Sequence, residues 1–196
     1  MGNHLSVLNA FELLGARASI VSHPEDLAQA DRIVLPGVGA FKDCMANLKA
    51  RHFIAPLNES KKSGKPILGI CLGMQAMARR SFEVGEYDGL GWFEGDVVRL
   101  KPADPELRIP QIGWNDISWK DDCSLFRGVP AGSDFYFVHS YQMSCVKTAD
   151  VVAVCDYGGS VTAAVLKENV FATQFHPEKS QDHGCKVLEN FLNWAP

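Results

Sequence analysis

The pentapeptide Gly69-Ile70-Cys71-Leu72-Gly73 constrains the fold more than any other segment of this chain. A strand-like apolar run over 66–70 leads into Cys71, and a helix-like run over 72–80 follows at once. A strand that turns sharply into a helix strains its corner residue and pushes that side chain outward, and flanking glycines relieve the crowding. A corner thiol also lies at a helix N-terminus, whose partial positive charge favours thiolate. The pentapeptide therefore predicts a nucleophile elbow built on sulfur; the alternative is a buried cysteine in an ordinary turn.

Segments typical of helices and strands alternate through the first half of the chain. In order they are a helix over 5–15, a strand over 18–21, a short helix over 24–30, a strand over 32–35 and one or two helices over 41–62. After about residue 90 short strands dominate, over 92–100, 109–119, 134–138, 151–157, 161–167 and 170–175, before an amphipathic helix over 182–194. The pattern predicts a single α/β domain spanning 1–196, with a parallel sheet covered on both faces.

Composition narrows the possible partners. The chain has 196 residues, of which 46% are apolar and 21% charged, as is ordinary for a globular protein. A net charge of −4 without a Lys/Arg cluster argues against nucleic acid, and no apolar run is long enough for a membrane span. The six cysteines are scattered, with no C-x-x-C pair and no histidine cluster at zinc spacing. We therefore expect reduced thiols, a cytoplasmic location, no metal and no cofactor.

A second candidate for chemistry is Phe175-His176-Pro177-Glu178, which ends an apolar strand. Ligands of open α/β sheets bind at the carboxyl ends of strands. On an extended segment, residues two apart point the same way, so Glu178 can accept a proton from one ring nitrogen of His176. The other nitrogen is then free to act as a base. The alternative is a surface His-Pro turn with a solvated glutamate.

A third candidate is the loop Pro36-Gly37-Val38-Gly39-Ala40, which also follows a buried strand. Its glycines allow the backbone to approach a ligand, and free N–H groups there can bind an oxyanion. The alternative is an ordinary glycine-rich loop; the third glycine of a phosphate-binding G-x-G-x-x-G is missing.

Together these motifs resemble the class I glutamine amidotransferases, whose catalytic residues run Cys, His, Glu along the chain. Further segments resemble the glutaminase subunits of imidazole glycerol phosphate synthases within that family. These segments are 36–41, 112–115, 136–141 and 176–180, and the resemblance covers nearly the whole chain. It implies a flavodoxin-like three-layer sandwich with a mostly parallel central sheet.

The resemblance also implies a mechanism. Cys71 would attack the side-chain amide of L-glutamine, His176 would take the thiol proton and later protonate the leaving ammonia, and Glu178 would orient His176. The resulting glutamyl thioester would be hydrolysed by water. The ammonia would pass to a (βα)8-barrel synthase subunit, the expected heterodimer partner, which makes imidazole glycerol phosphate and an aminoimidazole carboxamide ribotide in histidine biosynthesis.

Other residues receive roles from the same resemblance. Oxyanion donors would come from Gly37, Val38 and Leu72, with a backbone flip at the Gly37-Val38 peptide. The glutamine head group would be held by Gly39, Gln75, Ser140 and Tyr141. The surface toward the partner subunit would include Trp114, Tyr136 and Lys179.

Two departures from the family pattern leave alternatives open. Family members begin with an apolar strand, whereas this chain begins at Met1-Gly2-Asn3, inside the loop that follows that strand. We therefore expect the first strand to be missing, the natural start to lie about one strand length upstream, and unpaired backbone groups on neighbouring strands. If the strand is truly absent and the elbow does not form, the chain would be a non-catalytic subunit of the same fold. Gln111 stands where the family often has histidine, which leaves open a paralogue that supplies ammonia for sugar amidation in surface polysaccharide synthesis.

Overall fold

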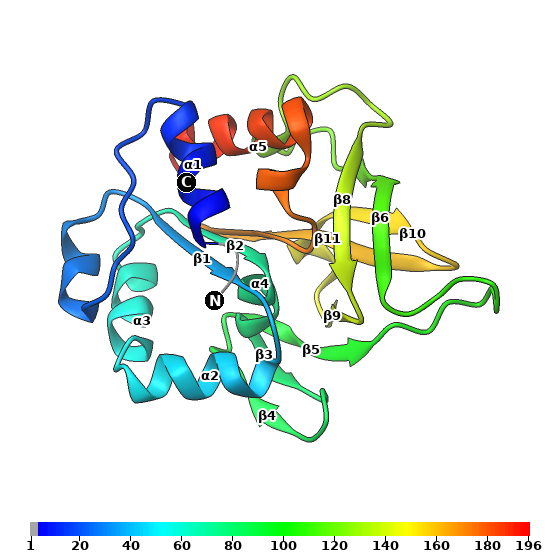
Figure 1. Cartoon of the computed structure of the whole chain (residues 1–196), viewed down its shortest axis with the longest axis horizontal. Helices are drawn as coiled ribbons and strands as arrows, with labels where there is room; N and C mark the ends of the chain where they lie inside the picture. The colour runs from blue at the N-terminus through cyan, green and yellow to red at the C-terminus, as the bar shows by residue number, and fades with distance from the viewer. Residues whose placement is uncertain (1–3) are drawn as a thin grey trace.

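A computed structural model describes residues 4–196, in which a six-stranded sheet lies between two layers of helices (Figure 1). Helices α1 and α5 cover one face of this sheet, and α2, α3 and α4 cover the other. The helices are α1 (His4–Leu13), α2 (Phe41–Ala50), α3 (Ile54–Lys62), α4 (Leu72–Ala76) and α5 (Gln181–Asn193). Short 3-10 helices are η1 (Pro24–Gln29), η2 (Ser124–Phe126), η3 (Thr148–Asp150) and η4 (Pro177–Lys179).

The central sheet has the strand order β1-β2-β12-β11-β10-β7. Its strands are β1 (Ile33–Gly37), β2 (Ile67–Cys71), β12 (Val170–Thr173), β11 (Ser160–Lys167), β10 (Val151–Asp156) and β7 (Ser118–Trp119). Four more strands form a second sheet in the order β4-β3-β5-β9: β4 (Tyr87–Asp88), β3 (Ala78–Ser81), β5 (Phe93–Arg99) and β9 (Tyr141–Cys145). A separate antiparallel pair joins β6 (Gln111–Asp116) and β8 (Asp134–His139).

The predicted α/β three-layer class is confirmed, and the central sheet is mixed rather than mostly parallel. Strand β2 pairs in parallel with β1 and β12, whereas β11 pairs antiparallel with both β12 and β10. The cause lies in the connections, because only Glu168 and Asn169 join β11 to β12. A two-residue link can join neighbouring strands only if they are antiparallel, because a parallel pair needs a crossover of a dozen or more residues.

Strand β2 is buried on both faces, and its side chains point alternately into two hydrophobic cores. Leu68 and Ile70 pack into the aromatic cluster under α1 and α5, which includes Phe171 and Phe175. Ile67 packs on the opposite side, in the cluster under α2, α3 and α4. At the end of β2, Cys71 belongs to the first of these cores and the next residue, Leu72, to the second.

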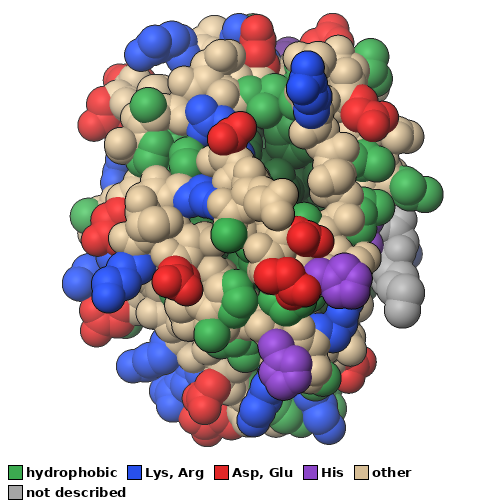
Figure 2. All heavy atoms as spheres, turned by 90° about the vertical axis from the view of Figure 1, so that its left-hand side faces the viewer, with side chains coloured by type: hydrophobic (Ala, Val, Ile, Leu, Met, Phe, Trp, Pro, Cys, Tyr) green, Lys and Arg blue, Asp and Glu red, His purple; other side chains and the backbone are tan. Residues whose placement is uncertain are grey.

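Strand β1 is the outermost strand of the central sheet, and within 4–196 it pairs on one side only, with β2. The expected exposed edge is therefore present, while residues 1–3, where we placed the remnant of a loop, lie outside the described residues. The predicted strand over 18–21 is wrong: no β-ladder includes this segment, and a strand exists only through its partner. Figure 2 shows this side of the molecule, where hydrophobic side chains line a hollow and acidic and basic side chains are interspersed around it.

The helix predicted over 72–80 is only partly right. Helix α4 ends at Ala76, and the chain continues as β3, which pairs in parallel with β5. Tertiary pairing overrides the helix propensity of Met77 and Ala78 here. Among residues 4–196, no helix combines the length and hydrophobicity needed to cross a bilayer.

Candidate active site

Cys71 occupies the strained corner that the pentapeptide predicts. It ends β2 and precedes α4, with φ 54° and ψ −110°, which is rare for a residue with a side chain. Gly73 makes this corner possible because a Cβ there would lie 1.7 Å from the carbonyl oxygen of Leu35. The elbow thus depends on close packing of α4 against β1.

His176 and Glu178 are paired as predicted, but by a different local structure. His176 Nδ1 lies 2.7 Å from Glu178 Oε1, and both side chains are almost fully buried. The prediction of an extended segment is wrong, because Pro177 begins the 3-10 helix η4 and His176 caps it. Proline is preorganised for a first helical position, so the turn itself brings Glu178 back to the ring.

The electrostatics of His176 follow from its two side-chain partners. Burial by itself would lower the pKa of His176, but the hydrogen bonds of its ring to Cys71 and Glu178 outweigh burial and raise the pKa to about 9. A pKa of about 9 favours the protonated imidazole at pH 7, so His176 and the Cys71 sulfur pair a proton donor with a nucleophile. Such a pair holds both the nucleophile and the proton that a leaving amine needs.

A cavity of about 340 Å³ opens over the thiol and brings most of the predicted site together. Eight predicted residues line it: Val38, Gly39, Cys71, Leu72, Gln75, Ser140, Tyr141 and His176. Glu178 lies behind His176, away from the lining, and Gly37 lies opposite Cys71 in the β1–β2 register. Leu72 is the first residue of α4, so its N–H has no acceptor within the helix and can serve a ligand.

Gln75 reaches the cavity with its amide already oriented. Its Nε2 donates to the carbonyl oxygen of Tyr141 at 2.9 Å and to Oε1 of Gln174 at 3.0 Å. Both donors are thereby used inside the protein, so Gln75 can offer a ligand only its carbonyl oxygen.

Sequence reasoning missed Glu83, which lies between β3 and β4 and lines the same cavity. Its Oε2 accepts the backbone N–H of Phe41 at 2.6 Å, so the carboxylate caps the N-terminus of α2. A lone glutamate in a turn carries no sequence signal for this position. Gln174 was also missed, because its contact with Cys71 joins segments far apart in sequence.

His139 also lines the cavity without having been predicted. Burial lowers its pKa to about 4, with the nearby charge of His176 acting in the same direction and a hydrogen bond to Tyr141 opposing it. Nδ1 lies 2.8 Å from the carbonyl oxygen of Tyr141 and Nε2 lies 3.0 Å from the side-chain oxygen of Gln111, and a neutral ring donates to only one of these acceptors. The lowered pKa of His139 favours its neutral form, whereas the raised pKa of His176 favours its charged form.

The three residues expected to face a partner lie together on the surface beside the site. The rings of Trp114 and Tyr136 meet edge to face at 5.8 Å, and Lys179 Nζ lies 5.6 Å from the Tyr136 ring centroid. Trp114 is 46% exposed and Ile112 on the same strand is 62% exposed. Ile112 and Trp114 on β6, Tyr136 on β8 and Lys179 on η4 together form a surface patch, which we call the exposed aromatic patch.

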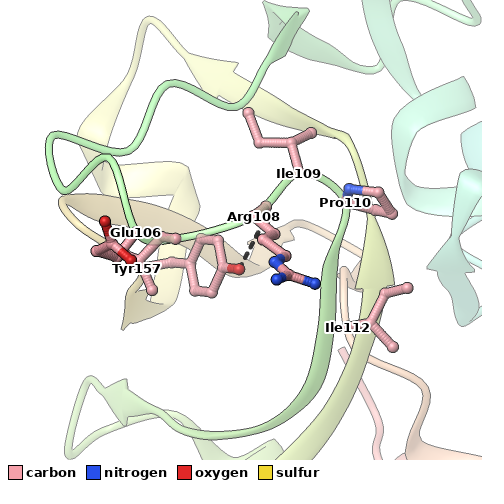
Figure 3. Close-up of a pocket in the computed structure, with 7 residues that line it drawn as sticks. Glu106, Arg108, Ile109, Pro110, Ile112 and Tyr157 are labelled. Carbon is pink, nitrogen blue, oxygen red and sulfur yellow. Dashed lines mark hydrogen bonds between the residues drawn. The ribbon is translucent and has the colours of Figure 1, made fainter.

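A larger cavity of about 420 Å³ lies outside this site (Figure 3). Tyr157 donates a hydrogen bond to the backbone oxygen of Arg108 there, and Pro110 lines both cavities. None of Cys71, His176 and Glu178 lines the larger cavity, so we place the active site at the smaller one.

Fold and site together define a glutaminase-type cysteine hydrolase, and comparison with known proteins gives its class. The sequence model of the family described as "Glutamine amidotransferase class-I" matches residues 2–194. Two solved structures share the fold at 20% identity and a TM-score of 0.76. They are a crystal structure of a glutamine amidotransferase (98% of this chain, 93% of that chain) and PurLQS from Thermotoga maritima (98% and 92%). The chain belongs to the class I glutamine amidotransferases, as the motifs indicated.

Within that class, its relatives are more specific. The chain is 47% identical to the imidazole glycerol phosphate synthase subunit HisH of Brucella suis biovar 1, over all of this chain and 95% of that protein. It is 48% identical to the HisH 1 subunit of Campylobacter jejuni, over 97% of this chain and 94% of that protein.

Proposed function

We propose that this chain is the glutaminase subunit of an imidazole glycerol phosphate synthase, acting in histidine biosynthesis. It hydrolyses L-glutamine to glutamate and ammonia and passes the ammonia to a (βα)8-barrel synthase subunit. The observation that carries the proposal is the geometry of the three residues: Cys71 and His176 line the same cavity of about 340 Å³, and Glu178 Oε1 lies 2.7 Å from His176 Nδ1. Full-length relatives named HisH support the pathway.

The mechanism assigned to these residues begins with the thiolate. Cys71 Sγ attacks the side-chain carbonyl carbon of glutamine, and the N–H of Leu72 with the Gly37-Val38 peptide binds the resulting oxyanion. His176 gives its proton to the departing ammonia, and a glutamyl thioester remains. His176 then takes a proton from water, the hydroxide displaces Cys71, and glutamate leaves. Glu178 holds the ring through Nδ1 at 2.7 Å throughout.

Recognition of glutamine is assigned to the rest of the lining. The carboxylate of Glu83 is placed to pair with the α-ammonium group, and Gly39, Gln75, Ser140 and Tyr141 surround the head group. The exposed aromatic patch at Trp114, Tyr136 and Lys179 is assigned to the synthase subunit, since exposed aromatic side chains are enriched in interfaces.

The two other functions considered are less well supported. A non-catalytic subunit would need an unformed elbow, whereas Cys71, His176 and Glu178 are assembled. A polysaccharide paralogue was suggested by Gln111, yet Gln111 is fully buried against His139, and the full-length relatives are named HisH.

The test measures glutamate release from glutamine by the chain alone, with the barrel subunit, and with that subunit plus its phosphoribosyl formimino substrate. We expect weak release by the chain alone and a large increase with both additions, because the oxyanion peptide must flip. A matched Cys71→Ser variant should lose glutamine-dependent synthesis while the complex still uses free ammonia. Turnover that is high without a partner, or no increase with both additions, would contradict the proposal.

A further inference from the structure

Gln174 stands between the end of β12 and His176 and is fully buried. Its backbone N–H donates to the carbonyl oxygen of Ala163 at 2.8 Å, which fixes the residue to β11. Its side chain extends to the thiol: Nε2 lies 3.6 Å from Cys71 Sγ, a hydrogen-bond distance for sulfur. No role in the mechanism above has yet been given to this amide.

The orientation of this amide is dictated by a short series of hydrogen bonds. The carbonyl oxygen of Tyr141 can only accept, so Gln75 must turn its NH₂ group inward. That group also faces Gln174 at 3.0 Å, so Gln174 must present its oxygen to Gln75. The NH₂ group of Gln174 is therefore aimed at the sulfur.

A donor at this position has a definite effect on the thiol. An N–H group stabilises the thiolate, because hydrogen bonding to the charged form favours that form. The backbone oxygen of Val138, 3.9 Å from Sγ, is an acceptor and would favour the protonated thiol instead. The Gln174 amide is the nearer of the two to the sulfur, at 3.6 Å against 3.9 Å for the Val138 oxygen.

We propose that Gln174 is a further catalytic residue, whose side-chain amide donates to the Cys71 sulfur and holds it as a thiolate pointed into the cavity. Gln75 has a second task under this proposal, as the positioning residue that orients Gln174. The inference rests on the proposed glutaminase function and adds a residue to its nucleophile.

The test is the pH profile of Cys71 alkylation by iodoacetamide in the isolated chain, with the site identified by mass spectrometry. Burial raises the pKa of Cys44, Cys145 and Cys155 to about 11, so these thiols remain protonated and slow near neutral pH. The variant is Gln174→Met, which keeps the volume and a weak acceptor for Gln75 but has no donor. We expect alkylation of Cys71 at pH 7 to slow about tenfold and the half-maximal rate to move about one unit upward, since hydrogen bonds to charged groups are the stronger ones.

Two further variants keep the result decisive. Asn169→Leu is the matched control, because Asn169 is a buried amide at the other end of β12 that donates to the backbone oxygens of Lys61 and Lys65; its profile should stay that of the wild type. Gln174→Asn keeps the amide but shortens the side chain, so it should show the same shift if Gln174→Met does not fold. A wild-type profile in a folded Gln174 variant overturns the role of Gln174. If the wild-type Cys71 itself reacts no faster than the other cysteines, the proposed function fails instead.

Discussion

At Cys71, a strained backbone and several polar contacts act on one sulfur atom. The positive φ aims the side chain out of the sheet, while His176 and Gln174 approach the sulfur from neighbouring segments. Strain of this kind, of order 1–3 kcal/mol, persists only when surrounding packing over-determines it. The crowded contact at Gly73 supplies that packing.

Replacing Glu178 by glutamine tests the charge behind His176. The carboxylate helps to raise the pKa of His176, so its loss should move this pKa down from about 9 toward the ordinary 6.5. We expect glutamine turnover by the complex to fall about 10²- to 10⁴-fold, the range typical of an acid–base group. The measurement is an NMR titration of the His176 ring in the isolated chain, paired with the turnover assay.

The control for that titration is Glu189→Gln, on the exposed side of α5, where Glu189 pairs with Lys186. It should leave the His176 titration unchanged. An unchanged titration in Glu178→Gln would show that Glu178 does not set the charge of the ring.

At the scale of elements, three segments of the chain meet at His176. The backbone N–H of His176 donates to Tyr136 on β8, and the hydroxyl of Ser180 at the start of α5 donates to the carbonyl oxygen of His176. The same hydroxyl accepts the N–H of Tyr136 at 3.0 Å. Since the ring of Tyr136 belongs to the exposed aromatic patch, a partner bound there would contact the same residue whose backbone supports His176.

Gly73→Ala tests how strongly the elbow depends on α4 packing against β1. The added Cβ would lie 1.7 Å from a backbone oxygen, so α4 must shift away from the strand. We expect the free energy of unfolding in urea to fall by about 1–3 kcal/mol, as for other overpacked sites. Alkylation of Cys71 should also slow, because its corner moves with α4.

Gly15→Asn is the control for that experiment. Gly15 has φ +79° with open space around it, and asparagine tolerates this conformation. It should change stability by less than about 1 kcal/mol and leave Cys71 reactivity alone. A Gly73→Ala variant as stable and reactive as this control would refute the packing argument.

The same elements show what the sequence could predict. Each of the three motifs is a short continuous segment that follows an apolar strand: the elbow, the His-Pro-Glu segment and the glycine loop. The positions of Cys71, His176 and Val38 could therefore be predicted from the residues next to them in the sequence. Helix α4 ended early because pairing of β3 with β5 depends on residues far along the chain. Glu83 reaches the cavity from a segment distant in sequence from the three motifs, and Gln174, although close to His176 in sequence, contacts Cys71 only through the pairing of distant strands.

At the scale of the whole molecule, two buried histidines beside one cavity differ in charge, because their pKa values are shifted in opposite directions. His139 is kept neutral, with its pKa lowered to about 4, mainly by burial. His176 is kept charged, with its pKa raised to about 9 by Cys71 and Glu178 despite burial. A positive charge on His139 would lie against that of His176, so the neutral state of one favours the charged state of the other.

These charge states predict a maximum of stability near pH 6.5 from the two groups together. As pH falls from 6.5 to 4, His139 binds a proton in the unfolded chain but not in the folded chain. The free energy of unfolding therefore falls, by about 3 kcal/mol for this group. The contribution of His176 to stability is complete below pH 6.5 and is lost as pH rises to about 9, because the folded chain holds this proton more tightly than the unfolded chain.

Urea unfolding followed by tryptophan fluorescence measures stability on both sides of this maximum, the acid limb and the alkaline limb. His139→Gln should flatten the acid limb, His176→Gln the alkaline limb, and the exposed His23→Gln neither. If the free energy of unfolding falls equally with acid in the wild type and in His139→Gln, the pKa of His139 is not lowered in the folded chain. The difference in charge between the two histidines would then be absent.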